Sequence, residues 1–514
     1  MKPRLLARTI TSCFLSLIAL SCADLVVDNT NNPNRDQALT RPADIESLIG
    51  SSFLNWWEGT QKDNNFPALT LSTMADAHTS SWGNWGMQDL SSEPRISFNN
   101  SPSYGYAGVC ELTWYRMYRS ISSVNDGLVY INKGNVITNT ANTLRAKAFA
   151  KFVQGIAHGW LALFFDKAFI VDENVVIDQS TVLQFQSYTQ VMNAAMTMLD
   201  STIAICGRGT FTTPNTWING LTHTNVQLRQ LAYAYKARFR AAVARNGTER
   251  AAADWNAIMA DAALGITTDF APVSDGNLWW DATKFRGNDP GWTRADYKTI
   301  GLTDTSGRYT TWLSTAVPSR DTIQLFTRDR RITGATYAAT GTDFRYSRPS
   351  PFQPARGTYH HSLYYHARYD YHVTTGTPAG AMPVFKTVEL DMMRAEGLLR
   401  TGGSTATIAT LINNTRVTRG QLPALTGAEP IADLWKWMRY EKMIETFATA
   451  GGLPWFDRRG WDELVSGTVL HFPVPGKELE ILLQAYYTYG GGGSGSAPKR
   501  SFDDFTPFKR VTPH

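Results

Sequence analysis

The chain has 514 residues, of which 43% are hydrophobic and 18% are charged. A chain of this length and composition can bury a large core, so disorder as the dominant state is excluded. Its 49 Lys and Arg residues nearly balance 44 Asp and Glu residues, and no clustered basic stripe is present, so nucleic acid is not expected as a partner. The 16 Trp residues stand out, because many lie in polar, Gly-rich stretches that cannot all be core. We therefore expect an exposed aromatic surface with a binding role.

Residues 1–21 are predicted to be a signal peptide of the lipoprotein type. They combine a basic start with an apolar run shorter than the roughly 20 residues that a membrane span needs. The run ends at Ser21 and Cys22, which resembles the lipobox of bacterial lipoproteins. We therefore expect Cys22 to carry lipid and to anchor the protein to a membrane. A plain secreted protein with a thiol near its cleavage site is the alternative. Residues 22–41 are rich in Asn, Asp and Pro and are expected to form an extended leader.

Helical periodicity predicts a mostly α fold with a single body at residues 42–489, followed by a Gly-rich joint and tail at residues 490–514. In residues 140–167 and 223–246, small residues alternate with large ones, which lets helices pack closely as in tetratricopeptide-type hairpins. The predicted helices span residues 42–58, 106–133, 140–167, 187–206, 223–246, 248–266, 385–401, 404–418 and 430–449.

Residues 59–105 and 268–384 break this helical pattern. They are rich in Gly, Asn, Asp, Ser and Pro and contain only short alternating runs, which are typical of a few short strands. Long loops of this kind in a compact protein usually carry function. The predicted architecture is a helical scaffold with two large irregular excursions.

No catalytic signature is found in the sequence. A Walker pattern, an HExxH pair and a GxSxG elbow are all lacking, and the GxGxxG match that begins at Gly490 lies in a glycine tract without a preceding strand or a following helix. The acids of glycosidases come from distant positions of a chain, so a surface glycosidase stays an alternative.

Metal binding is not expected, and no cofactor is predicted. Asp275, Asn277 and Asp281 loosely resemble a calcium loop that lacks its closing Glu, which leaves calcium as an open alternative. Cys110 and Cys206 have apolar neighbours and are predicted to be buried free thiols. Four histidines in a Tyr-rich segment lack an acidic partner at ligand spacing; they are His360, His361, His366 and His372.

Two aromatic and polar clusters are the best candidates for a binding site. A sugar ring has an apolar face and a rim of hydroxyls, so its site needs a flat aromatic ring beside Asn, Asp or Arg. The alternative is that these rings only fasten loops to the helices. Five further Trp with helical spacing are expected in the core: Trp114, Trp160, Trp255, Trp435 and Trp437. The candidate ligand-binding residues are Trp82, Asn84, Trp85, Trp279, Trp280, Trp292 and Tyr297.

Three features of the sequence resemble the SusD/RagB family of nutrient-binding outer-membrane lipoproteins. They are the lipobox-like Cys22, the segment VELDMMRAEGLLRTGG at 388–403, and the segment RYEKMIETFATAGGLPWFDRRGWDELVSGTVLHFPVPGKEL at 439–479. The resemblance implies four tetratricopeptide-like helix pairs with an irregular ligand-binding face. It also implies that the protein is not an enzyme and forms the lid of a SusC-like TonB-dependent transporter. Asp24 is similar to the acidic signal that directs such lipoproteins to the cell exterior.

The function predicted from the sequence is therefore non-catalytic capture of a nutrient, foremost an oligosaccharide, at the outer membrane and its delivery to the transporter. The rival functions are a surface glycoside hydrolase on a helical scaffold, and the same fold binding peptide or another nutrient. A charged series in the C-terminal segment is expected to be structural, through i,i+4 pairs and a tie at a helix end; it comprises Arg439, Glu441, Glu445, Asp457 and Arg458.

Overall fold

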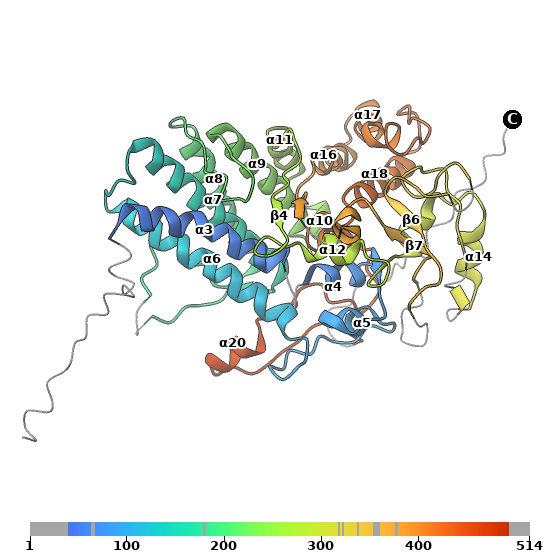
Figure 1. Cartoon of the computed structure of the whole chain (residues 1–514), viewed down its shortest axis with the longest axis horizontal. Helices are drawn as coiled ribbons and strands as arrows, with labels where there is room; N and C mark the ends of the chain where they lie inside the picture. The colour runs from blue at the N-terminus through green and yellow to red at the C-terminus, as the bar shows by residue number, and fades with distance from the viewer. Residues whose placement is uncertain are drawn as a thin grey trace, which may run out of the picture.

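The structure is a computed structural model that describes residues 40–492 except 63–66, 178–180, 317–318, 321–322, 337–338, 353–359 and 376–378. The predicted signal peptide, lipidated Cys22, nearly all of the leader and most of the C-terminal tail lie outside these residues. A helical scaffold occupies one side of the molecule, and a loop-rich region lies against its other side (Figure 1). Among the described residues, no helix is both long enough and apolar enough to cross a membrane.

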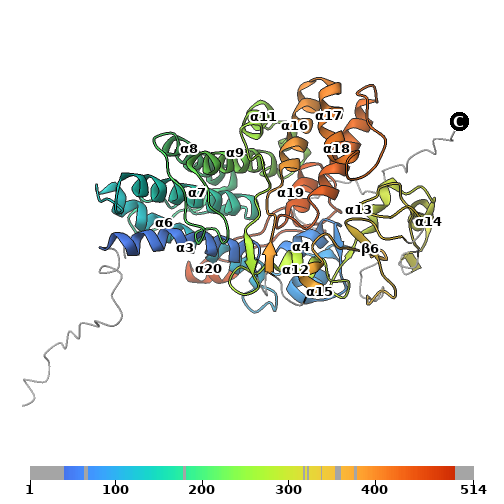
Figure 2. The same ribbon diagram turned by 45° about the horizontal axis from the view of Figure 1, so that its top comes forward.

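The scaffold helices form a continuous series from α3 to α18 in which successive helices pack together, except that α10 packs against α19 (Leu453–Gly460) and α9 contacts α11 directly (Figures 1 and 2). This arrangement confirms the predicted mostly α class. The predicted helix at 248–266 is two helices, because Asp254 caps the second one by accepting a hydrogen bond from the backbone of Ala257. The scaffold helices are α3 (Pro42–Thr60), α6 (Gly108–Asn132), α7 (Thr140–Phe164), α8 (Tyr188–Cys206), α9 (Asn225–Ala242), α10 (Gly247–Ala251), α11 (Trp255–Ala263), α16 (Thr387–Thr401), α17 (Thr405–Arg416) and α18 (Ile431–Glu445).

Close contact between scaffold helices depends on small residues. Gly159 of α7 lies against Phe239 of α9, and a Cβ atom at Gly159 would lie only 2.1 Å from that ring. Capping boxes at Ser187 and Thr224 satisfy backbone groups at the starts of α8 and α9. The alternation of small and large residues in the sequence therefore reports real helix contacts.

The loop-rich region contains short helices as well as short strands. Its strands form two-stranded antiparallel pairs, β1 (His78–Thr79) with β5 (Arg294–Ala295), β4 (Val273–Asp275) with β8 (Ala379–Ala381), and β6 (Phe344–Tyr346) with β7 (Tyr364–His366). A further antiparallel pair, β2 (Lys167–Ala168) with β3 (Gln186–Ser187), lies in the scaffold between α7 and α8. The helices are α4 (Pro67–Met74), η1 (Asn84–Gly86), α5 (Met87–Ser91), α12 (Ala282–Gly287), α13 (Tyr297–Ile300), η2 (Gly301–Thr303), α14 (Arg308–Ser314) and α15 (Tyr371–Thr374), and two more follow α18, α19 (Leu453–Gly460) and α20 (Gly476–Ile481).

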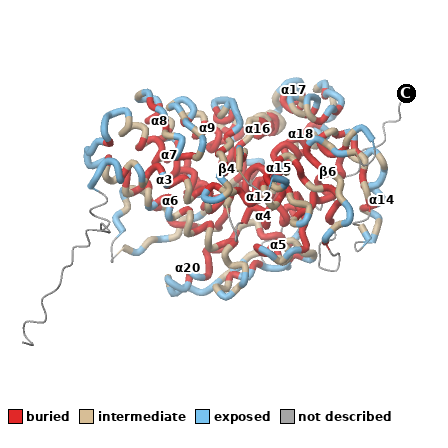
Figure 3. Tube along the Cα trace, viewed as in Figure 1, coloured by how far each residue is buried: buried red, intermediate tan, exposed pale blue. Residues whose placement is uncertain are grey.

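Two large apolar cores hold these parts together. The first lies among α3, α6, α7, α8 and α9, and the second joins the loop-rich region to α16, α17 and α18. Buried segments run through both regions, and exposed segments follow the outer edges (Figure 3). Cys110 and Cys206 are free and buried, as predicted. Trp114, Trp160 and Trp255 are also buried, whereas Trp435 and Trp437 are half-buried and pack against the second core.

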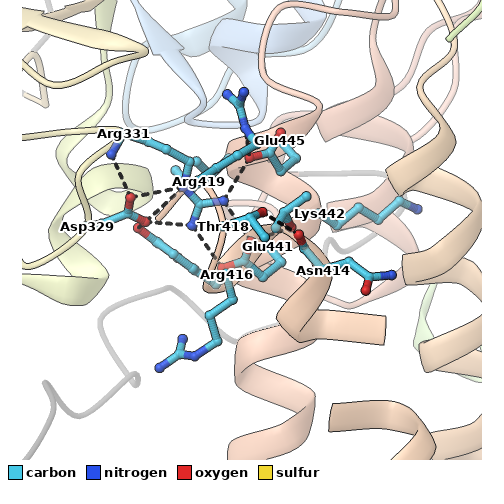
Figure 4. Close-up of polar contacts among 12 residues, drawn as sticks. Asp329, Arg331, Asn414, Arg416, Thr418, Arg419, Glu441, Lys442 and Glu445 are labelled. Carbon is cyan, nitrogen blue, oxygen red and sulfur yellow. Dashed lines mark hydrogen bonds and ion pairs between the residues drawn. The ribbon is translucent and has the colours of Figure 1, made fainter. Parts of the chain in front are cut away.

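A buried network of ion pairs ties the loop-rich region to α18 (Figure 4). The Arg331 guanidinium lies 2.7 Å from Glu441 and 2.9 Å from Glu445 on α18, and 2.7 Å from Asp329 in its own loop. Arg419 adds a contact of 2.7 Å to Glu445. The charged C-terminal series is therefore structural, but Glu441 and Glu445 bind partners on other elements instead of i,i+4 neighbours.

Candidate functional site

The β1 and β5 strands bring the two predicted aromatic clusters together. Thr79 pairs with Arg294 in antiparallel register, so the residues after Thr79 lie beside the residues before Arg294. The Ser80 hydroxyl donates a hydrogen bond of 2.8 Å to the carbonyl of Trp292. Trp82 Nε1 donates another, also 2.8 Å long, to the carbonyl of Gly291. Two loops that are more than 200 residues apart in sequence therefore form one surface.

Three indole rings and one guanidinium group form this surface, which we call the aromatic patch (Trp82, Trp85, Arg286 and Trp292). Trp85 stacks on Trp292 with ring centroids 5.4 Å apart, and Trp82 lies 6.1 Å from Trp292 at a tilt of 42°. The Arg286 guanidinium lies 4.3 Å from the centroid of the Trp292 ring. Trp82 is 39% exposed and Trp292 is half-buried, whereas Trp85 is only 7% exposed and supports the other rings from beneath.

The loop that carries Trp82 and Trp85 is held in an unusual backbone conformation. Trp85 has φ of 58° and Gly86 has φ of 73°, both in the left-handed region. This conformation costs a residue such as Trp roughly 1–3 kcal/mol, and such costs are typical of binding and catalytic sites. The Thr70 hydroxyl donates a hydrogen bond of 2.6 Å to the Trp85 carbonyl and helps to fix the turn.

Polar groups surround the aromatic patch. Asn84 is exposed on η1 between the two Trp residues of its loop. The Tyr104 hydroxyl donates a hydrogen bond of 2.8 Å to Asp89, and the Tyr106 ring lies edge-on to Tyr104 with 5.5 Å between centroids. Burial and the Asp89 carboxylate raise the pKa of Tyr104, so its hydroxyl stays protonated. The surroundings therefore offer amide and hydroxyl groups to a ligand.

Arg286 keeps donor capacity at the patch. Burial lowers the pKa of its guanidinium, and the nearby Asp289 carboxylate opposes this shift. Its Nε is buried and has no hydrogen-bond partner among the described residues. Its Nη atoms donate no hydrogen bond to the described residues, so these N–H groups remain for a ligand beside the Trp292 ring.

The other predicted ligand-binding residues lie elsewhere. Trp279 is 7% exposed and stacks in the first core on Phe53, with centroids 6.1 Å apart. Tyr297 is fully buried in the second core, 5.2 Å from the Trp312 ring. Trp280 is half-buried and lies 5.8 Å from the Arg286 guanidinium at the edge of the patch. The interpretation that rings fasten loops to the scaffold therefore describes Trp279 and Tyr297, which do not line the patch.

Sequence reasoning missed Arg286, Tyr104 and Tyr106. Arg286 lies six residues before Trp292, inside the second aromatic cluster, so its proximity to a ring could have been noticed. Tyr104 and Tyr106 occur in the segment SPSYGYAG, where aromatic rings beside Ser and Gly carry the same signal as the two clusters.

The candidate metal ligands serve other roles. One Asp275 oxygen accepts backbone hydrogen bonds from Asn277 and Trp279, and Asp281 binds the Lys284 ammonium at 2.9 Å. His360 contacts Glu93 at 3.0 Å, and the histidines of the Tyr-rich segment are buried. Among the described residues, no group of three or more His, Cys, Asp or Glu side chains is arranged to hold a metal ion.

No protein-family model matches the sequence, and no curated protein sequence matches it. Several solved structures match the fold. A SusD-like carbohydrate-binding protein from Bacteroides fragilis superposes with a TM-score of 0.57 at 14% identity over 90% of this chain and 96% of its own. A SusD superfamily protein from Bacteroides vulgatus gives 0.56 at 14% identity over 88% and 100%. Surface glycan-binding protein A from Bacteroides uniformis gives 0.51 at 14% identity over 80% and 86%. The chain therefore has the SusD-like fold.

Proposed function

We propose that the protein binds an oligosaccharide at the aromatic patch without altering it. The observation that carries this proposal is the stack of Trp82, Trp85 and Trp292 beside Arg286, with Trp82 open to solvent. Indole faces match the apolar faces of sugar rings, and Arg286 and Asn84 match their hydroxyl groups. Solved structures with this fold include proteins that are described as carbohydrate-binding and glycan-binding, which supports the same ligand class.

The geometry favours weak and reversible binding. A sugar that covers on the order of 50 Å² of one indole gains only about 1 kcal/mol, so several contacts are needed for micromolar to millimolar affinity. Only Trp82 and Trp292 offer ring surface to solvent, since Trp85 lies beneath them. Weak binding suits a protein that must release its ligand to a partner.

The carboxylates beside the patch favour binding over hydrolysis. A glycosidase needs two carboxyl groups about 5–9 Å apart that face the sugar. Asp89 accepts a hydrogen bond from Tyr104, and Asp289 accepts one of 2.8 Å from the backbone of Gly291. Both carboxylates are engaged in holding the loops that carry the rings.

Anchoring and delivery complete the proposal. Cys22 would carry the lipid that anchors the chain to the outer membrane, facing the cell exterior. The bound oligosaccharide would pass to a SusC-like TonB-dependent transporter. The support is the lipobox-like Cys22 and the resemblance of residues 388–403 and 439–479 to this lipoprotein family. Metabolic labelling with palmitate should be lost in Cys22→Ser, and crosslinking in intact cells should capture a large outer-membrane β-barrel. A barrel that is absent from the crosslinked material would contradict delivery.

Calorimetric titration with a panel of neutral hexasaccharides tests the binding site. Trp82→Ala and Trp292→Ala should each weaken binding of the preferred sugar at least fivefold, because each removes ring surface from the patch. Tyr486→Ala is a matched control, since Tyr486 is 46% exposed and lies outside the patch. Wild-type affinity in both Trp variants would contradict the site. Release of reducing ends would favour a surface glycoside hydrolase. Binding of peptides in place of sugars would favour a protein of the same fold that binds peptide.

A further inference from the structure

A groove on the scaffold lies far from the aromatic patch in sequence and uses none of its residues. It is lined by residues of α10, the last turn of α16, the first two thirds of α18 and the end of α19. Its volume is about 550 Å³, which is within the range of ligand sites. We call it the scaffold groove. Its lining includes Thr248, Arg400, Trp435, Arg439, Trp461 and Asp462.

Arg400 is held between two indole rings at one wall of the groove. Its guanidinium lies 5.0 Å from the ring centroid of Trp255 and 4.9 Å from that of Trp435. Nε and Nη2 donate hydrogen bonds of 3.0 and 2.9 Å to Glu396. Nη1 donates none to the described residues, so it is available to a ligand in the groove. Trp435 is half-buried and presents part of its ring to the same space.

Asp462 provides an acceptor in the lining of the same groove. Its Oδ1 accepts a hydrogen bond of 2.6 Å from the backbone of Gly247, and its Oδ2 accepts none from the described residues. Asp462 has φ of 58°, so its backbone is held in the left-handed region, where a non-Gly residue costs free energy. Thr248 is exposed beside it and adds a hydroxyl group. A donor, an acceptor, a hydroxyl and an indole ring thus line the same groove.

The cations that line the groove are each paired with a carboxylate. Arg400 pairs with Glu396, and Arg439 pairs with Glu463. Because these lining cations are already paired, an uncharged ligand fits the groove better than an anion.

We propose that the scaffold groove is a second binding site that takes one neutral pyranose unit of an oligosaccharide. Adjacent hydroxyls of a pyranose need a donor and an acceptor, which Arg400 and Asp462 supply. The apolar face of the ring stacks on Trp435. This site does not depend on the aromatic patch, so one can exist without the other.

The test isolates the groove by using the full chain with Trp82→Ala and Trp292→Ala. Saturation-transfer NMR and calorimetry with maltohexaose, cellohexaose, xylohexaose and mannohexaose should still detect binding of at least one probe. Adding Trp435→Ala should weaken that binding at least fivefold. Ala252→Trp, which fills the groove from an exposed position and removes no contact residue, should do the same. Tyr486→Ala should leave the affinity within twofold.

Two results would overturn the second site: no binding of any neutral probe, or binding that survives Ala252→Trp. Tighter binding of trigalacturonic acid than of the neutral probes would overturn the assigned ligand class. Failure of the aromatic patch has a different signature. In that case Trp82→Ala and Trp292→Ala leave the wild-type affinity unchanged. The effect of Ala252→Trp on binding still shows whether the groove is a second binding site.

Discussion

The helical scaffold and the loop-rich region both bury ion pairs, such as Arg250 with Glu396 in the scaffold, but they differ in what fixes the backbone. The scaffold packs small residues against large apolar ones, as at Gly159 and Phe239. The loop-rich region buries charged side chains and pairs them, as Arg331 does with Asp329 and with two carboxylates of α18. Irregular backbone lacks the periodic apolar face with which a helix packs. Specific ion pairs therefore hold the loops against the scaffold. The two regions should therefore respond differently to mutation.

The largest effect is expected at the buried ion network. Arg331→Ala leaves the carboxylates of Asp329, Glu441 and Glu445 buried with less compensation, which should cost about 3–5 kcal/mol of unfolding free energy. Arg345→Ala is the control, because its pair with Asp370 is made by a side chain that is 46% exposed. That exposed pair should contribute about 0–1 kcal/mol. Urea unfolding followed by circular dichroism compares them, and similar losses in both variants would contradict a special role for the network.

A pair of Trp variants separates core from surface within the predicted aromatic set. Trp279→Ala empties space in the first core beside Phe53 and should cost about 3–5 kcal/mol. Trp82→Ala removes an exposed ring and one hydrogen bond to Gly291, and should cost about 1 kcal/mol or less. Binding should show the reverse order, with the loss confined to Trp82→Ala. Thermal unfolding and calorimetry measure the two quantities, and a larger stability loss in Trp82→Ala would reverse our assignment.

Acid should weaken both regions through buried histidines. Burial lowers the pKa of His158 on α7 to about 4, and it lowers the pKa of His78 on β1 to about 4. The unfolded chain takes up a proton on each below pH 6.5 while the folded chain does not, so stability falls as pH drops from 6.5 toward 4. Each group should cost about 2 kcal/mol between pH 7 and 5.

Denaturant unfolding at pH 7, 6 and 5 checks this pH dependence. The slope of unfolding free energy against pH reports how many more protons the unfolded chain binds than the folded chain. His158→Gln and His78→Gln should each lower this number by up to one. If only one variant changes the slope, the two regions do not unfold as one unit.

A further contrast between the two regions concerns a single methyl group. Gly159→Ala places a Cβ against Phe239 and should cost about 1–3 kcal/mol through overpacking, although Ala normally favours a helix over Gly. Gly105 in the loop-rich region has open space around its Cβ direction, so Gly105→Ala should change stability by about 0.5 kcal/mol or less. Melting temperatures of the two variants give the comparison, and a stabilised Gly159→Ala would show that α7 and α9 can separate without cost.

The scaffold could be predicted from the sequence because helix formation depends on residues that are close together in the chain. The alternation in residues 140–167 and 223–246 produced α7 and α9 close to the expected bounds. The loop-rich region could not be predicted in the same way. The β1 and β5 strands have two residues each, too few for a periodic signal, and their pairing joins positions far apart in the chain.

The candidate site shows the same division. Trp82, Trp85 and Trp292 were predicted from composition, which identifies rings in polar surroundings but not their burial. Composition alone could not separate them from Trp279, which stacks on Phe53 in a core. Arg286 was missed because its role depends on a through-space contact with Trp292.

The short hydrogen-bonded link between Trp82 and Gly291 makes the aromatic patch a property of the complete tertiary structure. Any sugar that engages both sides of this link holds together two stretches that are separate in the unfolded chain. Such a ligand must raise the melting temperature, by the equivalent of roughly 2.7 kcal/mol when its concentration is a hundred times its dissociation constant. A thermal-shift screen of plant, fungal and bacterial glycans can therefore find the natural cargo before its chemistry is known.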